Sequence, residues 1–177
     1  VVCDGRLAAE VAMNFLLEKG HKKIAYIGDC SYESRYVGYC ETLIQNHIPM
    51  DYELIKQTDQ TRETAIPAFQ SLLEEKKNEE ADFTAILCAN DITAVSALEI
   101  LAKEKKKVRD SISIISIDNV EEAQNTKPLL TTVNIPMDEM VHMAILLLRD
   151  RISLGHREIM KIEFPCRVVE RESVHSL

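Results

Sequence analysis

Residues 24–46 read IAYIGDCSYESRYVGYCETLIQN and combine one strand with one helix. The apolar run at 24–28 has the length of a buried strand, and its final glycine favours a turn. From about residue 34 to 46 the apolar side chains recur at a helical period; they are Val37, Tyr39, Cys40, Leu43 and Ile44. A strand followed by a helix is the unit from which parallel α/β sheets are built.

The same alternation continues along the chain. The pattern predicts a short strand at 54–55, a helix at 62–75, a buried strand at 83–88, a helix at 91–103 and a strand at 112–117. We expect Pro67 in the first turn of its helix, where a missing N–H removes no hydrogen bond. This spacing favours a parallel sheet with helices on both faces and right-handed crossovers.

The pattern restarts after Thr132. A helix is predicted at 137–152 and a strand at 159–164. The helix should turn five apolar side chains inward, namely Met140, Val141, Ala144, Leu147 and Leu148. At the start of the chain, a strand at 1–3 and a helix at 7–18 resemble half of a second βα layer. Two strands and two helices make a thin core whose edges would need partners.

Composition limits the classes of protein to consider. The 177 residues allow one or two domains, and 46% apolar residues suit a globular protein. The net charge of −8 makes this segment alone a poor DNA binder, because binding to nucleic acid depends on neutralising phosphate. The basic run at 105–107 is interpreted as a solvated face at a helix end.

The cysteines and the chain ends indicate a cytoplasmic setting. The five cysteines contain no CxxC pair, and we interpret them as small buried hydrophobes rather than a disulfide framework. No run approaches the roughly 20 apolar residues of a membrane span. The first residues show no secretion signal, and the missing initial Met leads us to expect a piece of a longer chain.

Enzyme motifs are absent from the sequence. It contains no GxxxxGK[ST], GxGxxG, GxSxG or HExxH, and its five histidines are scattered. His21 follows a glycine at a predicted helix end, where a cation or a capping donor is useful. We therefore expect no catalytic residues, no metal site and no cofactor.

Polar side chains follow three of the predicted strands. Ser31 and Arg35 come after the strand at 24–28, Asn90 after the strand at 83–88, and Asp118 after the strand at 112–117. Ligands of parallel α/β sheets bind outside the carboxyl ends of the strands. An arginine, an amide and a carboxylate in one crevice can hold a polyhydroxylated molecule.

Each of these residues also has a purely structural interpretation. Asn90 or Asp91 could cap the helix that follows, and Asp118 could cap a short segment at 120–125. Arg35 could pair with Glu33 or Glu41 on the surface. The recurrence of polar residues at consecutive strand ends favours a shared site.

Six stretches resemble motifs of LacI/GalR transcription regulators, in the same order along the chain. GHKKIAYIG at 20–28 resembles GH(R/K)xIAxIxG, and residues 31–39 resemble SxxxRxxGY. CAND at 88–91 resembles the family's xANDxxAxGA, with Ser96 at a usual glycine. SIISIDN at 113–119 resembles SIxGFDN, with Ser116 at a usual glycine. PLLTTV at 128–133 resembles PPLTTV, and VERES at 169–173 resembles LVxRxS.

The resemblance implies a fold of two Rossmann-like lobes hinged around an effector site, as in type I periplasmic binding proteins. It assigns 22–133 plus 166–174 to the C-terminal lobe, and 1–20 plus 136–164 to a partial N-terminal lobe. The family's helix-turn-helix is expected outside this sequence. We therefore expect an exposed apolar edge that a partner chain or the rest of the first lobe would cover.

The resemblance also aligns specific residues with the effector site. Ser31, Arg35, Asn90 and Asp118 fall at effector-contacting positions. Gln60 stands where many members place an aromatic ring that stacks on the ligand, and this departure leaves the ligand open. The remaining aligned positions are Asp4, in the family's VxxDN stretch with Gly5 at its Asn, and Ile135 and Met137, at a lobe crossover lining the cleft.

These observations predict the effector-sensing part of a cytoplasmic repressor that binds a small, sugar-like ligand. The family implies a homodimer that meets operator DNA only through the helix-turn-helix, with no membrane partner. One alternative is a sugar-binding protein of an uptake system, which should have a secretion signal and few free thiols. Another is an enzyme on the same sheet, which should place a catalytic pair beside the strand ends.

Overall fold

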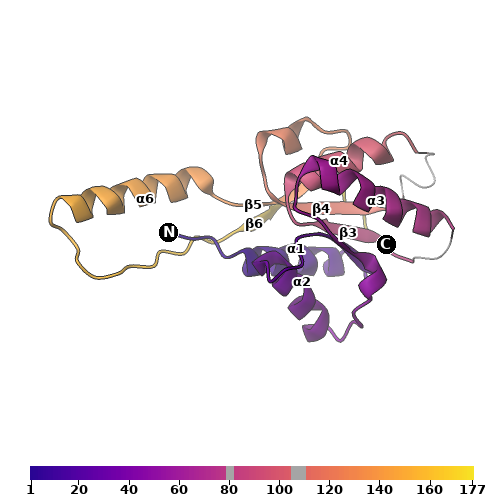
Figure 1. Cartoon of the computed structure of the whole chain (residues 1–177), viewed down its shortest axis with the longest axis horizontal. Helices are drawn as coiled ribbons and strands as arrows, with labels where there is room; N and C mark the ends of the chain where they lie inside the picture. Colours follow the sequence, from indigo (N-terminus) through magenta and orange to yellow (C-terminus); the bar gives the residue numbers. More distant parts are fainter. Residues whose placement is uncertain (79–81, 105–110) are drawn as a thin grey trace.

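A six-stranded sheet forms the centre of the molecule (Figure 1). The computed structural model describes residues 1–78, 82–104 and 111–177, so the basic run at 105–107 lies outside the described residues. The sheet order is β2-β1-β3-β4-β5-β6, and only β5 and β6 pair antiparallel. The strands are β1 (Ile24–Gly28), β2 (Ile55–Gln57), β3 (Ala85–Cys88), β4 (Ser113–Asp118), β5 (Thr131–Asn134) and β6 (Arg167–Val169). The predicted α/β class is confirmed.

Helices cover both faces of this sheet, as predicted (Figure 1). One face carries α1 (Gly5–Glu18) and α2 (Ser34–Gln45), and the other carries α3 (Arg62–Lys77) and α4 (Asp91–Leu101). Two short 3₁₀ helices, η1 (Tyr52–Leu54) and η2 (Glu121–Asn125), lie in the connections. Every residue of β1 and β3 is buried, which is what coverage of both faces requires.

The pleat of the strands divides the core into two apolar clusters. Along β1, Ala25 and Ile27 join the cluster under α3 and α4, whereas Ile24 and Tyr26 join the cluster under α1 and α2. Successive side chains of a strand point to opposite faces, so one apolar run serves both clusters. This explains why these strands show no alternation of polar and apolar residues.

The helices α1 and α2 approach each other closely at Gly38. A Cβ added to Gly38 would overlap the carbonyl oxygen of Arg6 and press on the side chain of Ala9. The alanines of α1 complete this close contact, because Ala8, Ala9 and Ala12 are fully buried. The two helices therefore form one tightly packed layer.

The predicted position of Pro67 is wrong. The helix α3 begins at Arg62, which places Pro67 in its interior rather than in its first turn. Pro67 is exposed, so water can satisfy the carbonyl group that its missing N–H leaves without a helical partner. The solvent-facing position makes an interior proline tolerable.

An arm, formed by residues 136–164, projects away from the sheet (Figure 1). Its helix α6 (Met137–Ile152) matches the predicted bounds, but none of its residues is buried. Val141 and Leu148, which we expected to face inward, are 53% and 61% exposed. The helix predicted at 137–152 is confirmed. Its predicted burial is wrong, because among the described residues no element packs over its apolar side chains.

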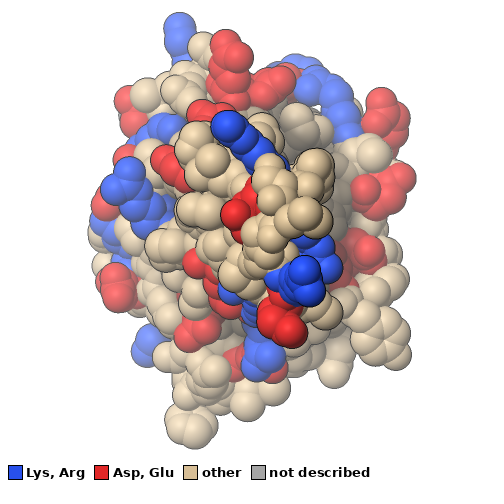
Figure 2. Space-filling model, turned by 90° about the vertical axis from the view of Figure 1, so that its left-hand side faces the viewer, with Lys and Arg blue, Asp and Glu red and all other residues tan. Residues whose placement is uncertain are grey.

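The predicted strands at 1–3 and 159–164 are reduced to one parallel bridge between Val2 and Glu163. Figure 2 views the molecule from the side that bears the arm, where acidic and basic side chains are interspersed among uncharged residues. The expected exposed apolar edge is present on the arm, where Ile145 is 59% and Ile159 is 92% exposed.

The position of α1 corrects one proposed lobe boundary. We assigned residues 1–20 to the partial N-terminal lobe, together with the arm. Instead, Met13 and Leu16 of α1 are fully buried in the cluster that contains Tyr26 of β1. The helix α1 thus belongs to the main sheet, because its apolar face is filled by α2 and the strands.

The cysteines are more exposed than we expected. All five are free, and only Cys88 is buried; Cys3, Cys30, Cys40 and Cys166 are half-buried. The interpretation as buried hydrophobes therefore applies to Cys88 alone. No helix in the described part of the chain has both the length and the apolar character needed to cross a bilayer.

Candidate ligand-binding site

Arg35 and Asp118 meet at the carboxyl edge of the sheet. Arg35 lies in the first turn of α2, and its Nη2 donates to Oδ1 of Asp118, the last residue of β4, over 2.8 Å. Its Nη1 donates to the carbonyl oxygen of Ala89, directly after β3. One guanidinium therefore joins groups at the ends of β1, β3 and β4, and the proximity that the strand-end pattern predicted is present for Arg35 and Asp118.

Glu33 places Arg35 and adds a second carboxylate to this site. Its side chain caps α2 by accepting from the backbone N–H of Arg35 at 2.8 Å, and its Oε1 lies 3.9 Å from Nε of Arg35. Glu41, the other surface partner that we considered, pairs with Arg6 instead. The side chains of Arg35 and Asp118 are only 21% and 29% exposed, so their interaction is weakly screened.

Burial raises the pKa of Asp118 to about 6. The charge of Arg35 acts in the opposite direction, whereas the carboxylates of Asp91 and Glu33 raise this pKa further. The backbone at Asp118 and Asn119 has positive φ angles of 123° and 59°, a region that residues with a Cβ rarely adopt. The site therefore combines a partly desolvated carboxylate with a strained backbone.

We expect Asp118 to titrate near pH 6. The pKa in the folded chain lies above the ordinary value of 3.8, so the folded state binds this proton more tightly. The stability contributed by protonation of Asp118 is therefore full below about pH 4 and lost as the pH rises through about 6. The measurement is a carboxyl-carbon NMR titration, with Asp118→Asn to identify the signal. A midpoint at or below 3.8 would contradict this expectation.

The side chain of Asn90 is engaged by the fold. Its Oδ1 accepts from the backbone N–H of Thr93 at 2.9 Å and caps α4, as the structural alternative proposed. Its Nδ2 donates to the carbonyl oxygen of Gln60 at 3.0 Å. Gln60 has a positive φ of 64°. These bonds bring Asn90 and Gln60 together and engage one donor and one acceptor site of the Asn90 amide, which has two of each.

Asp91 is a buried acceptor that the sequence reasoning considered only as a cap. It receives hydrogen bonds from the hydroxyl of Ser116, the hydroxyl of Thr132 at 2.6 Å and the backbone N–H of Val120 at 2.8 Å. Burial raises its pKa, and these hydrogen bonds oppose the shift. Asp91 thus ties α4 to β4, β5 and the turn that carries Asp118.

The N-terminal segment borders the Arg35 site through Gly5. Asp4 caps α1 by accepting from the N–H of Arg6 at 2.9 Å. A Cβ at Gly5 would overlap the hydroxyl oxygen of Ser34 and press on Cγ of Arg35. The glycine at this position, where the LacI/GalR motif has Asn, is explained by this contact.

Ser31 and Tyr32 lie on an exposed loop beside the same strand ends. The backbone N–H of Ser31 donates to Asp29 at 2.7 Å, and Gln57 of β2 donates to the same carboxylate at 3.0 Å. Tyr32, which the sequence reasoning missed, is 97% exposed and has a positive φ of 67°. The available signal was an aromatic residue four positions after the end of the predicted strand.

The two apolar candidates lie at the base of the arm. Ile135 follows β5 and packs against the cluster under α1 and α2, whereas Met137 begins α6 and is 57% exposed. No hydrogen bond or apolar cluster of the described residues joins Met137 to Arg35. The described ranges also contain no group of three or more metal-ligating side chains.

Comparisons with known proteins place this geometry in a family. A model described as a periplasmic binding protein-like domain matches residues 13–174. The repressor PurR of Klebsiella pneumoniae subsp. pneumoniae is 33% identical over 168 residues, which are 93% of this chain and 48% of that protein. The repressor CytR of Escherichia coli K12 is 33% identical over 180 residues, or 98% of this chain and 51% of its own length. The chain spans about half the length of the curated relatives it matches.

Solved structures are similar over nearly the whole chain. A sugar-binding LacI-family regulator from Escherichia coli, complexed with phosphate, aligns with a TM-score of 0.86 at 27% identity, covering 100% of this chain and 63% of that one. A complex of the regulator CelR with cellobiose also has a TM-score of 0.86, at 26% identity, covering 97% of this chain and 53% of that one.

Proposed function

Because this chain belongs to the periplasmic binding protein-like family, among the LacI-type transcription regulators, we propose that it is the effector-sensing part of a transcriptional repressor. Its ligand is a small polar molecule, with sugars and sugar derivatives as the first class. The single observation that carries this proposal is the ion pair between Arg35 and Asp118 at the carboxyl edge of the sheet.

The chemistry of this pair suits a molecule with several hydroxyl groups. A guanidinium offers five N–H donors, and its bonds to Asp118 and Ala89 engage only part of that capacity. Asp118 keeps a second oxygen that can accept from a hydroxyl group. Ser31, Gln60, Asn90 and Asp4 border this edge, and Ile135 and Met137 line the approach from the arm.

The arm and the parts of the protein outside this sequence also have proposed roles. The arm, residues 136–164, contributes to a first lobe, and the ligand binds in the cleft between that lobe and the six-stranded sheet. The whole repressor is a cytoplasmic homodimer without catalytic activity, and it meets operator DNA through a helix-turn-helix outside this sequence. The relatives are repressors, which favours this function over the uptake-system alternative.

A thermal-shift screen tests the proposed function. Sugars, sugar phosphates and purines are added separately, and a compound that binds the folded state must raise the melting temperature. At a ligand concentration 100 times Kd the stabilisation is about 2.7 kcal/mol. The control is Arg35→Ala, which should show a smaller shift at the same ligand concentration, because its Kd is higher. No stabilising compound, or equal shifts in the wild type and Arg35→Ala, would contradict the proposal.

A further inference from the structure

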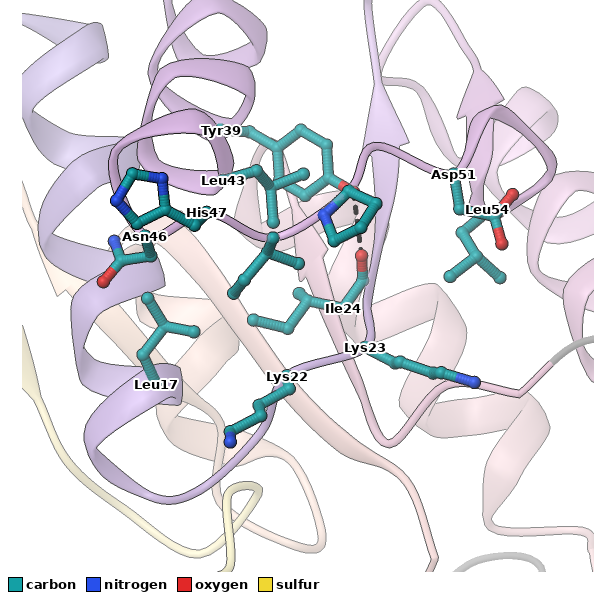
Figure 3. A pocket seen from close by; sticks show the side chains of 12 residues that line it. Leu17, Lys22, Lys23, Ile24, Tyr39, Leu43, Asn46, His47, Asp51 and Leu54 are labelled. Atoms are coloured by element: carbon teal, nitrogen blue, oxygen red, sulfur yellow. Dashed lines mark hydrogen bonds between the residues drawn. The ribbon is translucent and has the colours of Figure 1, made fainter.

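A hollow lies at the edge of the sheet opposite the Arg35 site, where β1 begins (Figure 3). We call it the α1–α2 pocket. Its volume is about 640 Å³, within the usual range of small-molecule sites. Arg35 lies in the first turn of α2 and Asn46, which lines the pocket, is the residue that caps its end; eleven residues of helix cover about 16 Å. The α1–α2 pocket is therefore separate from the Arg35 site.

The wall of the α1–α2 pocket is apolar. It is formed by Leu17, Ile24, Leu43, Ile48, Pro49 and Leu54. Tyr39 also lines it, but its hydroxyl group donates to the carbonyl oxygen of Ile24 at 2.8 Å. The tyrosine therefore presents mainly its ring to the pocket, and a ligand would need an apolar body.

The rim of the pocket is polar and asymmetric. Figure 3 shows Lys22, Asn46 and His47 on one side, and Lys23 and Asp51 on the other. The amine of Lys23 is already paired with Asp82 at 2.7 Å. Within residues 1–78, 82–104 and 111–177, no carboxylate forms an ion pair with Lys22. An anionic group is therefore favoured beside Lys22 and disfavoured beside Asp51.

We infer that the α1–α2 pocket is a second ligand site, for a small amphipathic anion with an aliphatic or aromatic body and one carboxylate group. The body fills the apolar wall, and the carboxylate lies at the Lys22 side of the rim, where the Nδ1/Nε2 edge of His47 adds a potential donor. This site does not depend on the proposed effector function, because it uses none of the residues at the Arg35 site.

The test is an amide NMR titration of the whole chain with 4-phenylbutyrate, compared with the neutral 4-phenylbutyramide. We expect saturable shifts at residues 22–24 and 43–51, with the carboxylate binding at least three times more tightly than the amide. Lys22→Gln should weaken phenylbutyrate binding three- to tenfold. The matched control is Lys127→Gln, a lysine at another surface hollow, which should leave binding unchanged.

A second variant separates the contribution of the apolar wall to probe binding from the contribution of the Lys22 charge. Leu17→Trp keeps Lys22 but fills the pocket, and it should abolish the saturable shifts. The exposed face of α6 could also attract the probe. Shifts confined to residues 137–152 and insensitive to both variants would overturn the inference, as would equal binding of the carboxylate and the amide.

Discussion

Replacing Asp91 with alanine is expected to lower the free energy of unfolding by about 3–4 kcal/mol. Asp91 is fully buried and accepts from Ser116, Thr132 and the N–H of Val120. Its loss leaves these three donors without an acceptor in a site that water does not reach. The effect stays below the sum of three charged hydrogen bonds, because burying the carboxylate is itself unfavourable, as its raised pKa indicates.

The matched control is Asp59→Ala. Asp59 also accepts three hydrogen bonds, from the N–H and hydroxyl of Thr61 and from the hydroxyl of Thr64, but it is exposed at the start of α3. Its loss should lower stability by about 1 kcal/mol, as for an ordinary cap. The measurement is urea unfolding followed by circular dichroism. Similar losses of unfolding free energy in the two variants would show that the buried hydrogen bonds of Asp91 stabilise the fold no more than the exposed ones of Asp59.

Replacing Arg35 with alanine is expected to weaken effector binding by about 1–3 kcal/mol, which is roughly a fivefold to 150-fold rise in Kd. The change removes the charged donors of the proposed site and leaves Asp118 without its ion pair. The pKa of Asp118 should then rise above its value of about 6, so a further part of the acceptor is protonated near neutral pH. Calorimetric titration with a compound found by the thermal-shift screen measures the loss.

Two further variants separate binding from folding. Arg35→Lys keeps the positive charge but loses the planar fork, so it should recover only part of the affinity. Arg6→Ala removes a guanidinium from the exposed pair with Glu41 and should leave affinity unchanged. If Arg35→Ala lost stability but kept full affinity, Arg35 would be a structural residue and the proposed site would be wrong.

Local patterns were sufficient to predict most of the fold. The bounds of β1 and α6 agree with the sequence interpretation, because the length of an apolar run and its period depend on neighbouring residues alone. The burial of α6 was mispredicted because burial depends on what packs against a helix. The place of α1 was mispredicted for the same reason: its apolar face does not reveal which sheet it covers.

The site was predicted in outline only. Parallel strands end at one edge, so the proximity of Arg35 and Asp118 followed from sequence order. The carbonyl group of Ala89 carries no side-chain signal and was missed. Asn90 satisfies both its capping interpretation and a contact with Gln60, and a sequence pattern cannot separate these uses. The ligand-binding roles of these residues stay predictions.

The positive φ angles at Asp118 and Asn119 bring an unstrained backbone into conflict with the carboxylate that pairs with Arg35. Glycine is the residue that adopts such a conformation without a steric penalty, yet glycine at 118 would remove the only acidic partner that Arg35 has on β4. Evolution toward higher melting temperature alone would therefore favour losing this carboxylate. Stabilised variants selected without a binding assay should be checked at this position first, since one substitution here can raise the melting temperature and weaken effector binding.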